Sequence, residues 1–332
     1  MSGIFSYPLQ FKPIFKEKIW GGGALREKLG KDVPPRLLIG ESWEVSAWGE
    51  NQTRVACGEF EGASLGELFA KDPAGLAGTA GESKDGFPLL FKFIDARENL
   101  SIQVHPSAEQ AAAHGWGDRG KTECWYVVDA LEGAKIAVGF NRNNVTPEEA
   151  AAAVSEGCFE SLVNYIPVKA GDVFFIPPGT VHAIMKDVLI YEVQEESDTT
   201  LRLYDWSRIT PDGCVRKLHV KKALEIINFK ENRPLYPVPI LIEENAGYAF
   251  ESRCDNTKFF LGQYIFKTAS KADLKPADVF RVLSAIAGKA SVTAGKVTVP
   301  LNKGQTVLIP ARLSNVELEG EAGSSVLVTM PK

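Results

Sequence analysis

The chain has few cysteines for its length, and their spacing excludes two common kinds of cross-linked structure. Among 332 residues there are only five cysteines, and no two of them form a Cys-x-x-Cys pair. An odd number without close pairs argues against both a disulfide framework and a zinc site built from thiolates. We therefore expect thiols that are either buried, since unpaired cysteine packs as a small apolar residue, or without a role, at Cys57, Cys124, Cys158, Cys214 and Cys254.

Runs of basic residues and long apolar runs are also missing. The net charge is −5, and the lysines and arginines are scattered, so the sequence lacks the electrostatic signature of a nucleic-acid or membrane-surface binder. No apolar run approaches the length of a membrane span, and the start, MSGIFSYPLQFKPIF, lacks the pattern of a secretory leader. These absences predict a cytoplasmic protein that binds a small molecule and is a monomer or a weak homo-oligomer.

Short β segments dominate what is present. The hydrophobic content of 45% with 24% charged residues is typical of a soluble globular protein. Segments such as FPLLFKFID (87–95), ECWYVVDA (123–130) and KVTVPL (296–301) are rich in β-branched and aromatic residues and are separated by Gly, Pro, Asn and Asp. Many strands at such short spacing favour a β-sandwich or a jelly-roll barrel.

Helices are few, and their starts can be read from the sequence. Capping boxes, in which a Ser or Thr is followed three residues later by Glu or Gln, begin at Ser64, Ser107 and Thr146. The last of these helices should stop at Gly157, because glycine accepts the backbone conformation that ends a helix. Residues 219–228 are a fourth candidate helix.

A proline-rich stretch suggests that the chain is divided into two β units. ENRPLYPVPILIEENAG (231–247) contains three prolines and has the composition of a connection. We place a boundary near residue 235. This gives a catalytic unit over 1–235, with N-terminal strands and a short helical segment, and a degenerate β unit over 236–332.

An internal repeat supports this division. KAGDVFFIPPGTVHAI (169–184) and NKGQTVLIPARLSNVEL (302–318) each contain a glycine followed, after five residues, by a proline. At the position of His182 in the first copy, the second copy has Asn315. Two β barrels are expected, of which only the first keeps the histidine.

Histidine is scarce, with four in the chain, and two of them occupy positions that suggest a shared site. In LSIQVHP (100–106), strand alternation puts Ser101, Gln103 and His105 on one face and three apolar residues on the other. His182 follows a Pro-Pro-Gly turn that needs its prolines and glycine for backbone reasons but does not need a histidine.

A carboxylate on a third segment completes the candidate site. Lys121 and Glu123 share a strand face with two bulky apolar residues, and buried charges need partners or a metal. Gln103, His105, Glu123 and His182 together offer two imidazoles, a carboxylate and an amide oxygen, which suit zinc but also iron, manganese or cobalt. A single histidine in such a position is more often a hydrogen-bonded or exposed residue. The joint occurrence of His105, Glu123 and His182 on separate strands favours a metal site.

The remaining two histidines are expected to be structural. His114 lies at a predicted helix end, where its ring can satisfy terminal carbonyl groups. His219 opens the candidate helix over residues 219–228. Neither is predicted to bind the metal.

The stretch YEVQEESDTTLRLYDWSR is unusually polar for two flanking β segments. Alternation puts Glu192 and Gln194 on one face, and Thr200, Arg202 and Tyr204 on another. A guanidinium between two leucines suits recognition of an anion. The alternative for Arg202 is a structural ion pair with one of the nearby aspartates, Asp198 or Asp205.

These stretches together resemble the type I mannose-6-phosphate isomerases, a zinc-dependent branch of the cupin superfamily. LSIQVHP, KTECWYV, PPGTVHAI and EVQEESDTTLRLYDWSR carry the resemblance, in that order. It spans about residues 5–230 and, through the repeat, extends plausibly over the whole chain. The fold that it implies is mainly β, with two cupin-like jelly-roll barrels and a few short helices.

The resemblance also implies which residues form the site. The family's metal ligands, for one Zn²⁺ per chain, fall on Gln103, His105, Glu123 and His182. Its essential arginine matches Arg202 and its proposed acid/base glutamate matches Glu192, while Ser101 and Lys121 match positions that line the substrate site. The catalytic candidates are therefore Arg202, Glu192 and Lys121, and the substrate-binding candidates are Ser101, Lys121 and Arg202.

Three departures from related sequences accompany this match. Gln103 replaces the first histidine of the general cupin motif, as is normal within the isomerases. The asparagine that general cupins often carry after His182 is absent. The large helical insertion of eukaryotic members is missing too, so the chain resembles the compact bacterial form.

The activity that the resemblance implies is interconversion of mannose 6-phosphate and fructose 6-phosphate by metal-assisted proton transfer through a cis-enediol. Three alternatives stay open. One is an iron-dependent oxygenase on the same ligands. The others are a metal-containing sugar-phosphate binding or regulatory protein without turnover, and an isomerase paralogue with a different sugar preference.

Overall fold

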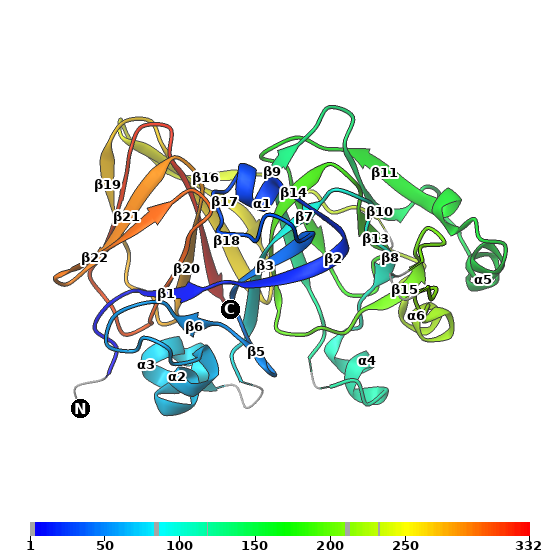
Figure 1. Cartoon of the computed structure of the whole chain (residues 1–332), viewed down its shortest axis with the longest axis horizontal. Coiled ribbons are helices and arrows are strands. Elements are labelled where there is room, and N and C mark those ends of the chain that lie inside the picture. Colours follow the sequence, from blue (N-terminus) through cyan, green and yellow to red (C-terminus); the bar gives the residue numbers. More distant parts are fainter. Residues whose placement is uncertain (1–3, 83–85, 118, 210–212, 232) are drawn as a thin grey trace.

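Antiparallel strand pairs make up most of the regular secondary structure of the protein (Figure 1). The structure is a computed structural model that describes residues 4–82, 86–117, 119–209, 213–231 and 233–332. Two sheets are formed only by residues of the N-terminal two thirds. The first is five-stranded, in the order β11 (Val163–Pro167), β10 (Lys135–Phe140), β13 (His182–Ile184), β8 (Ile102–Val104) and β15 (Leu201–Tyr204). The second is six-stranded, in the order β12 (Val173–Ile176), β9 (Glu123–Ala130), β14 (Val188–Glu195), β7 (Leu89–Ala96), β3 (Ile39–Val45) and β2 (Ile14–Gly22).

Two further sheets contain the C-terminal strands. The larger is eight-stranded, in the order β16 (Ile240–Glu244), β17 (Tyr248–Asp255), β18 (Phe259–Phe266), β25 (Ser325–Pro331), β20 (Arg281–Ala287), β23 (Thr306–Ile309), β1 (Leu9–Lys12) and β6 (Arg54–Val55). The smaller is four-stranded, in the order β19 (Ser270–Leu274), β24 (Val316–Gly320), β21 (Lys289–Ala294) and β22 (Val297–Asn302). A short ribbon joins β4 (Ala47–Trp48) to β5 (Asn51–Gln52).

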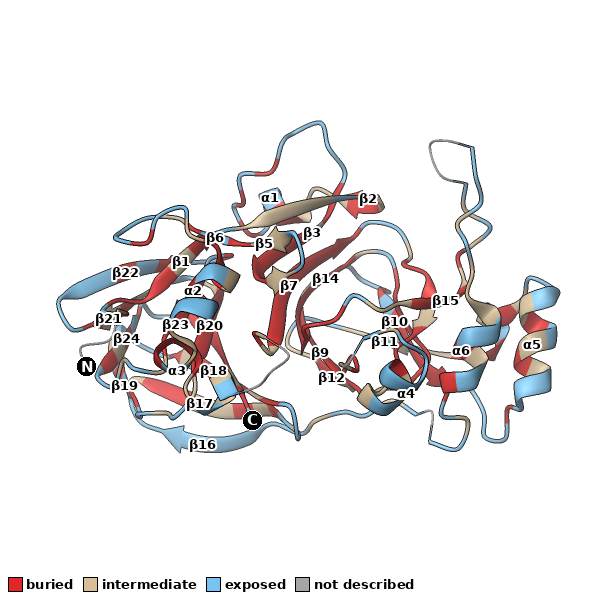
Figure 2. Cartoon of the chain, turned by 90° about the horizontal axis from the view of Figure 1, so that it is seen from below, coloured by how far each residue is buried: buried red, intermediate tan, exposed pale blue. Residues whose placement is uncertain are grey.

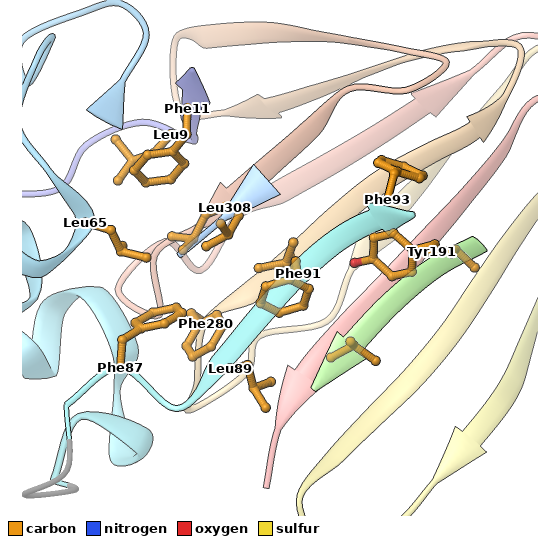
Figure 3. Close-up of a cluster of buried hydrophobic side chains, with 14 of the residues drawn as sticks. Leu9, Phe11, Leu65, Phe87, Leu89, Phe91, Phe93, Tyr191, Phe280 and Leu308 are labelled. Carbon is orange, nitrogen blue, oxygen red and sulfur yellow. The ribbon is translucent and has the colours of Figure 1, made fainter. Parts of the chain in front are cut away.

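The six- and eight-stranded sheets pack against each other through a large aromatic core. Phe91 and Phe93 of β7 and Tyr191 of β14 lie in one buried cluster with Leu308 of β23 and with Phe280 (Figure 3). Because side chains alternate along a strand, the neighbours of these residues point to the opposite face, toward the five-stranded sheet. Strands covered on both faces read as near-continuous apolar runs, which explains the segment FPLLFKFID.

The other faces of the stack are covered in the same way. A second core, with Trp125 and Ile190 from the six-stranded sheet and Ile184 from the five-stranded sheet, fills the space between those two sheets. A third lies between the eight- and four-stranded sheets. The middle strands are accordingly buried along their length (Figure 2). The mainly β fold expected from the sequence is confirmed, and the two sheet pairs are consistent with the predicted two barrels.

Helices are short and lie at the margins of the sheets. They are α1 (Ala24–Glu27), α2 (Leu65–Lys71), α3 (Pro73–Ala77), α4 (Ala108–Ala113), α5 (Pro147–Ser155) and α6 (Val220–Ile226), with 3₁₀ turns η1 (Thr79–Glu82) and η2 (Phe159–Leu162). Helices α5 and α6 pack against the outer face of the five-stranded sheet. No helix within the described ranges has the length and apolar character needed to cross a membrane.

The predicted helix starts are confirmed, with one difference in detail. The capping boxes at Ser64 and Ser107 form both of their reciprocal bonds. At α5, Thr146 accepts the bond from the Glu149 amide, but the Glu149 carboxylate forms an ion pair with Arg142 and does not close the box. A competing cation near a helix start is not visible in the local pattern.

Long-range strand pairing adds two features that the sequence did not indicate. Strand β1 pairs with β23 and β6, so residues near the start of the chain belong to the sheet of the C-terminal strands. The proline-rich stretch 231–247, expected to be only a connection, contains β16, an exposed edge strand paired with β17. The division of the chain near residue 235 remains a prediction.

The repeated glycine has a conformational cause. Gly171 and Gly304 have positive φ angles of 92° and 83°, which explains why both copies of the repeat keep glycine at this turn. At Gly304 the turn also approaches another segment closely, since an added Cβ would lie 2.2 Å from the carbonyl oxygen of Leu29. The Lys31 ammonium donates a hydrogen bond of 2.7 Å to the Gly304 carbonyl.

Gly304→Ala should therefore destabilise the protein more than a matched glycine substitution. Gly295 has a φ of 61° and no atom within 4 Å of an added Cβ, so Gly295→Ala measures the conformational cost alone, about 1 kcal/mol. The clash should add about 2 kcal/mol to the loss at Gly304. Urea unfolding of both variants checks this. Equal losses in the free energy of unfolding would show that the 29–31 segment moves to accommodate the added Cβ without destabilising the protein.

Candidate metal centre and active site

Two facing sheets bring three of the four predicted metal ligands together. His182 opens β13 and His105 follows β8, neighbouring strands in which His182 is paired with Gln103. Glu123 opens β9 in the opposing six-stranded sheet. The Nε2 atoms of the two histidines lie 3.1 Å apart, and Glu123 Oε1 lies 3.2 Å from His105 Nε2. Glu123 Oε2 lies 3.8 Å from His182 Nε2.

The outer nitrogens of both imidazoles are fixed by backbone carbonyls. His105 Nδ1 lies 2.8 Å from the Thr199 oxygen, and His182 Nδ1 lies 2.8 Å from the Thr180 oxygen. A carbonyl can only accept, so each Nδ1 carries the hydrogen and each Nε2 presents a lone pair to the centre. This is the tautomer and the carbonyl support typical of metal-binding histidines.

Burial keeps the imidazoles neutral, and a neighbouring ammonium keeps the carboxylate charged. Burial, with the charge of Lys121, lowers the pKa of His105 to about 3, and burial also lowers the pKa of His182. Although burial alone would raise it, the positive charge of Lys121 holds the pKa of Glu123 well below its usual range. Two neutral imidazoles and one carboxylate are a donor set suited to a divalent first-row metal.

An unpartnered carboxylate oxygen in this cluster also indicates a cation-binding site. Glu123 Oε2 is fully buried and accepts no hydrogen bond from any described residue, which is costly for a charged oxygen. The ligand atoms of His105, Glu123 and His182 all lie within 4.8 Å of one another. These three residues therefore fit a bound metal ion.

Gln103 lies beside the same centre. Its terminal amide is 3.4 Å from His105 Nε2 and 3.3 Å from His182 Nε2, and its oxygen accepts a bond from the Ser101 hydroxyl. In this orientation the amide nitrogen points to the centre, and a half turn of the amide brings the oxygen there. Its role as a fourth ligand remains a prediction.

Next to the centre, a cavity of ≈ 90 Å³ opens between the five- and six-stranded sheets. Its charged lining residues are Lys18, Glu41, Lys92, Lys121, Glu123, Glu192, Asp198, Arg202 and Arg216. Two larger hollows on the described surface, of ≈ 820 and ≈ 810 Å³, contain none of the histidines. The predicted residues Ser101, Lys121, Glu192 and Arg202 thus all border the cavity that adjoins the candidate metal ligands.

Lys121 and Glu192 flank this cavity from the six-stranded sheet side. The Lys121 ammonium is 2.8 Å from Glu123 Oε1 and 3.3 Å from His105 Nε2. Glu192 Oε2 accepts a bond of 3.0 Å from the indole of Trp125, and Oε1 lies 3.1 Å from the Lys92 ammonium. Burial, together with the Glu123 charge, raises the pKa of Glu192 despite Lys92.

Arg202 enters the cavity from β15, where it is paired with Gln103. Its Nε is buried and has no hydrogen-bond partner within the described part of the chain. Asp205 instead pairs with Arg208 at 3.5 Å and with Arg216 at 3.3 Å. No ion pair joins Arg202 to Asp198 or Asp205 among the described residues, and Arg202 borders the cavity with its Nε unpartnered.

Tyr204 was expected on the same face as Arg202, and that expectation is wrong. The register between β15 and β8 shifts between Arg202 and Tyr204, so that Tyr204 is opposite Ile102. A bulge changes the side to which the following side chain points. Tyr204 packs edge-on against Trp206 in the apolar cluster beneath α5 and α6.

Sequence reasoning missed a row of charges at the back of the cavity. Lys92 lies opposite Glu192 in the β14–β7 ladder, and its ammonium donates 2.6 Å to Gln194. Glu41 lies 2.9 Å from Lys18, and the charges of Lys18 and Lys92 overcome burial to hold the pKa of Glu41 at about 2. A lysine inside the apolar run FPLLFKFID was the available signal, because a buried ammonium requires acidic partners.

The two remaining histidines lie outside the centre, as expected. His114 is the residue that caps the C-terminus of α4, and its ring stacks on Trp116 with centroids 4.3 Å apart. His219 precedes α6, and its Nδ1 accepts a bond of 3.2 Å from the Arg202 amide.

Comparison with known proteins relates this site to a family. The family model of the type I phosphomannose isomerase catalytic domain matches residues 9–150, and that of the mannose-6-phosphate isomerase cupin domain matches residues 257–329. The chain is 38% identical to mannose-6-phosphate isomerase ManA of Bacillus subtilis, over 95% of this chain and 96% of that protein. The chain belongs to the type I mannose-6-phosphate isomerase family.

Other members of the isomerase family agree in length and in fold. The mannose-6-phosphate isomerase of Streptococcus mutans is 34% identical over 95% of this chain and 96% of its own length. The crystal structure of the mannose 6-phosphate isomerase from Bacillus subtilis superposes with a TM-score of 0.88 and 32% identity, covering 98% of this chain and 99% of the other. The resemblance inferred from four sequence motifs is confirmed.

Metal binding should stabilise this isomerase through the histidine pair. At about 100 times the dissociation constant, a bound ion adds about 2.7 kcal/mol to the free energy of unfolding. Zn²⁺ should therefore raise the melting temperature of metal-free wild-type protein and of His114→Ala, but not of His182→Ala. Calorimetry of the three proteins checks this, and an equal rise in His182→Ala would place the ion elsewhere.

Proposed function

We propose that the protein is a mannose-6-phosphate isomerase that interconverts mannose 6-phosphate and fructose 6-phosphate. The similarity to ManA over 95% of the chain supports this proposal. The geometry supports it too, since two histidines and a glutamate surround one centre beside a charged cavity. The thiols of Cys57, Cys124, Cys158 and Cys254 form no disulfide, which fits the predicted reducing, cytoplasmic location.

The reaction moves a proton between C1 and C2 of the sugar through a cis-enediol, while the adjacent oxygens exchange carbonyl and hydroxyl character. His105, Glu123 and His182, with Gln103 as the proposed fourth ligand, would hold one zinc ion. When bound, zinc supplies a Lewis acid that stabilises negative charge on those oxygens. The ligands and the zinc identity are part of the proposal.

Glu192 is the proposed proton carrier. A carboxylate transfers a carbon-bound proton best when its pKa lies nearer to neutrality, and burial shifts the pKa of Glu192 in that direction. The Trp125 indole fixes one oxygen by a hydrogen bond of 3.0 Å. Lys92, 3.1 Å from the other oxygen, compensates the charge when the proton has left.

Arg202 and Lys121 are the proposed partners of the negative charges of the substrate. The Arg202 guanidinium has an unpartnered Nε, and Arg216 lies nearby on the same cavity wall. A planar guanidinium can bind a phosphate through two parallel hydrogen bonds. Lys121 lies next to the metal ligands and is therefore the better placed of the two for charge that develops on the enediol oxygens, with Ser101 beside it in the substrate site.

A coupled assay for fructose 6-phosphate tests the function. Mannose 6-phosphate should give product, chelation should abolish turnover, and added Zn²⁺ should restore it. Glucose 6-phosphate and free mannose are the comparison substrates. Binding of mannose 6-phosphate without product would support the binding-protein alternative, and product from only another sugar would show a paralogue with a different preference.

Arg202→Ala should reduce turnover by at least about 100-fold, because it removes a preorganised cation from a water-poor site. The fold and the metal content should stay unchanged, as circular dichroism and metal analysis can check. Arg312→Ala, at a half-exposed arginine paired with Asp72 at 3.5 Å, is the control and should keep wild-type turnover. Near-normal turnover of Arg202→Ala would remove Arg202 from the mechanism.

A further inference from the structure

The end of strand β14 carries a buried carboxylate that the proposed mechanism does not use. Glu195 follows the residue paired with Glu123 in the β14–β9 ladder. Its Oε2 accepts a hydrogen bond of 3.0 Å from the backbone N–H of Thr122, and its own N–H donates 3.1 Å to the carbonyl of Thr122. One residue therefore holds both polar groups of the Thr122 backbone.

Thr122 is the residue between Lys121 and Glu123. The backbone of Lys121 is fixed too, because its N–H donates 3.0 Å to the carbonyl of Pro106. Consecutive side chains of a strand point in directions set by the backbone between them. The orientation of the Thr122 peptide thus determines whether the Lys121 ammonium and the Glu123 carboxylate stay 2.8 Å apart and aimed at the histidines.

The second oxygen of the Glu195 carboxylate is bound by the C-terminal part of the chain. Glu195 Oε1 lies 2.7 Å from the ammonium of Lys258, which sits in the turn between β17 and β18. The backbone of this turn is itself held, since the Lys258 carbonyl accepts a bond of 3.0 Å from Lys332. The Glu195 side chain is only 10% exposed, so its charge needs this cation.

We propose that Glu195 and Lys258 are positioning residues for the metal centre. Lys258 holds the carboxylate from the eight-stranded sheet, the carboxylate holds Thr122, and Thr122 fixes the directions of Lys121 and Glu123. The C-terminal strands thereby support the chemistry without contacting the substrate. The expected effect on turnover rests on the proposed function, whereas the expected effect on metal retention rests on the geometry alone.

Substitutions at both ends of this chain of contacts test the proposal. Glu195→Gln cannot serve both donors, because its NH₂ group must face either the Thr122 N–H or the Lys258 ammonium. Lys258→Met removes the cation and keeps an unbranched apolar side chain, whereas Lys258→Arg keeps the charge. Lys271→Met is the matched control, because Lys271 also belongs to the C-terminal strands and pairs with Glu317 at 2.7 Å.

The measurements are the rate at which each zinc-loaded protein loses its ion to a chromogenic chelator, kcat for mannose 6-phosphate, and the melting temperature. Glu195→Gln should lose zinc about tenfold faster and turn over about tenfold more slowly, the usual effect of removing a group that orients a ligand. Lys258→Met should show a change of about threefold, since an ammonium 43% exposed is partly screened. Lys258→Arg and Lys271→Met should match the wild type.

Wild-type zinc retention and kcat in both Glu195→Gln and Lys258→Met would overturn the positioning role. Changes of the same size in Lys271→Met would also overturn it, because they would reflect a general loss of stability. If Glu195→Gln fails to fold, the Lys258→Met and Lys258→Arg pair decides the question. Absence of isomerase activity in the wild type would instead refute the proposed function, and the chelator rates would still test the positioning.

Discussion

The site depends on one electrostatic conflict, the approach of two imidazole lone pairs to 3.1 Å beside a buried carboxylate. Neutral Nε2 atoms repel each other at this distance, and Glu123 has an oxygen with no donor in the described chain. A divalent cation satisfies all three groups at once. The carbonyls of Thr199 and Thr180 set this arrangement before any ion binds, because they fix the tautomer of both rings.

The packing of the sheets makes such a site possible. The six-stranded sheet presents Phe91, Phe93 and Tyr191 to the eight-stranded sheet, and it presents Lys92, Glu123 and Glu192 to the cavity on the other face. Alternation along β14 separates Tyr191, in the apolar core, from Glu192, at the site. The ionisable groups are therefore attached to strands that are held rigidly from behind, which favours precise geometry at a catalytic centre.

The sequence predicted those features that follow from local pattern. His105 and His182 could be recognised because one lies on a polar strand face and the other follows a turn that does not need it. Lys92 was missed because its partners, Glu41 and Glu192, lie on other strands and become its neighbours only through sheet pairing. Tyr204 was misplaced because the bulge after Arg202 leaves no mark in the alternation. Strand β1 pairs with β23, which is almost three hundred residues away along the chain, and a local sequence pattern cannot predict so distant a partner.

The insertion of β1 between β23 and β6 has a consequence for the autonomy of the two β units. A fragment ending near residue 235 would leave β1 without β23 and would expose Phe91, Phe93 and the other apolar side chains that now face the eight-stranded sheet (Figure 3). Exposed apolar surface and an unpaired strand edge both promote aggregation. The C-terminal strands, whose copy of the repeat has Asn315 in place of the histidine, thus cover apolar surface of the catalytic unit, and we expect a fragment that ends near residue 235 to aggregate.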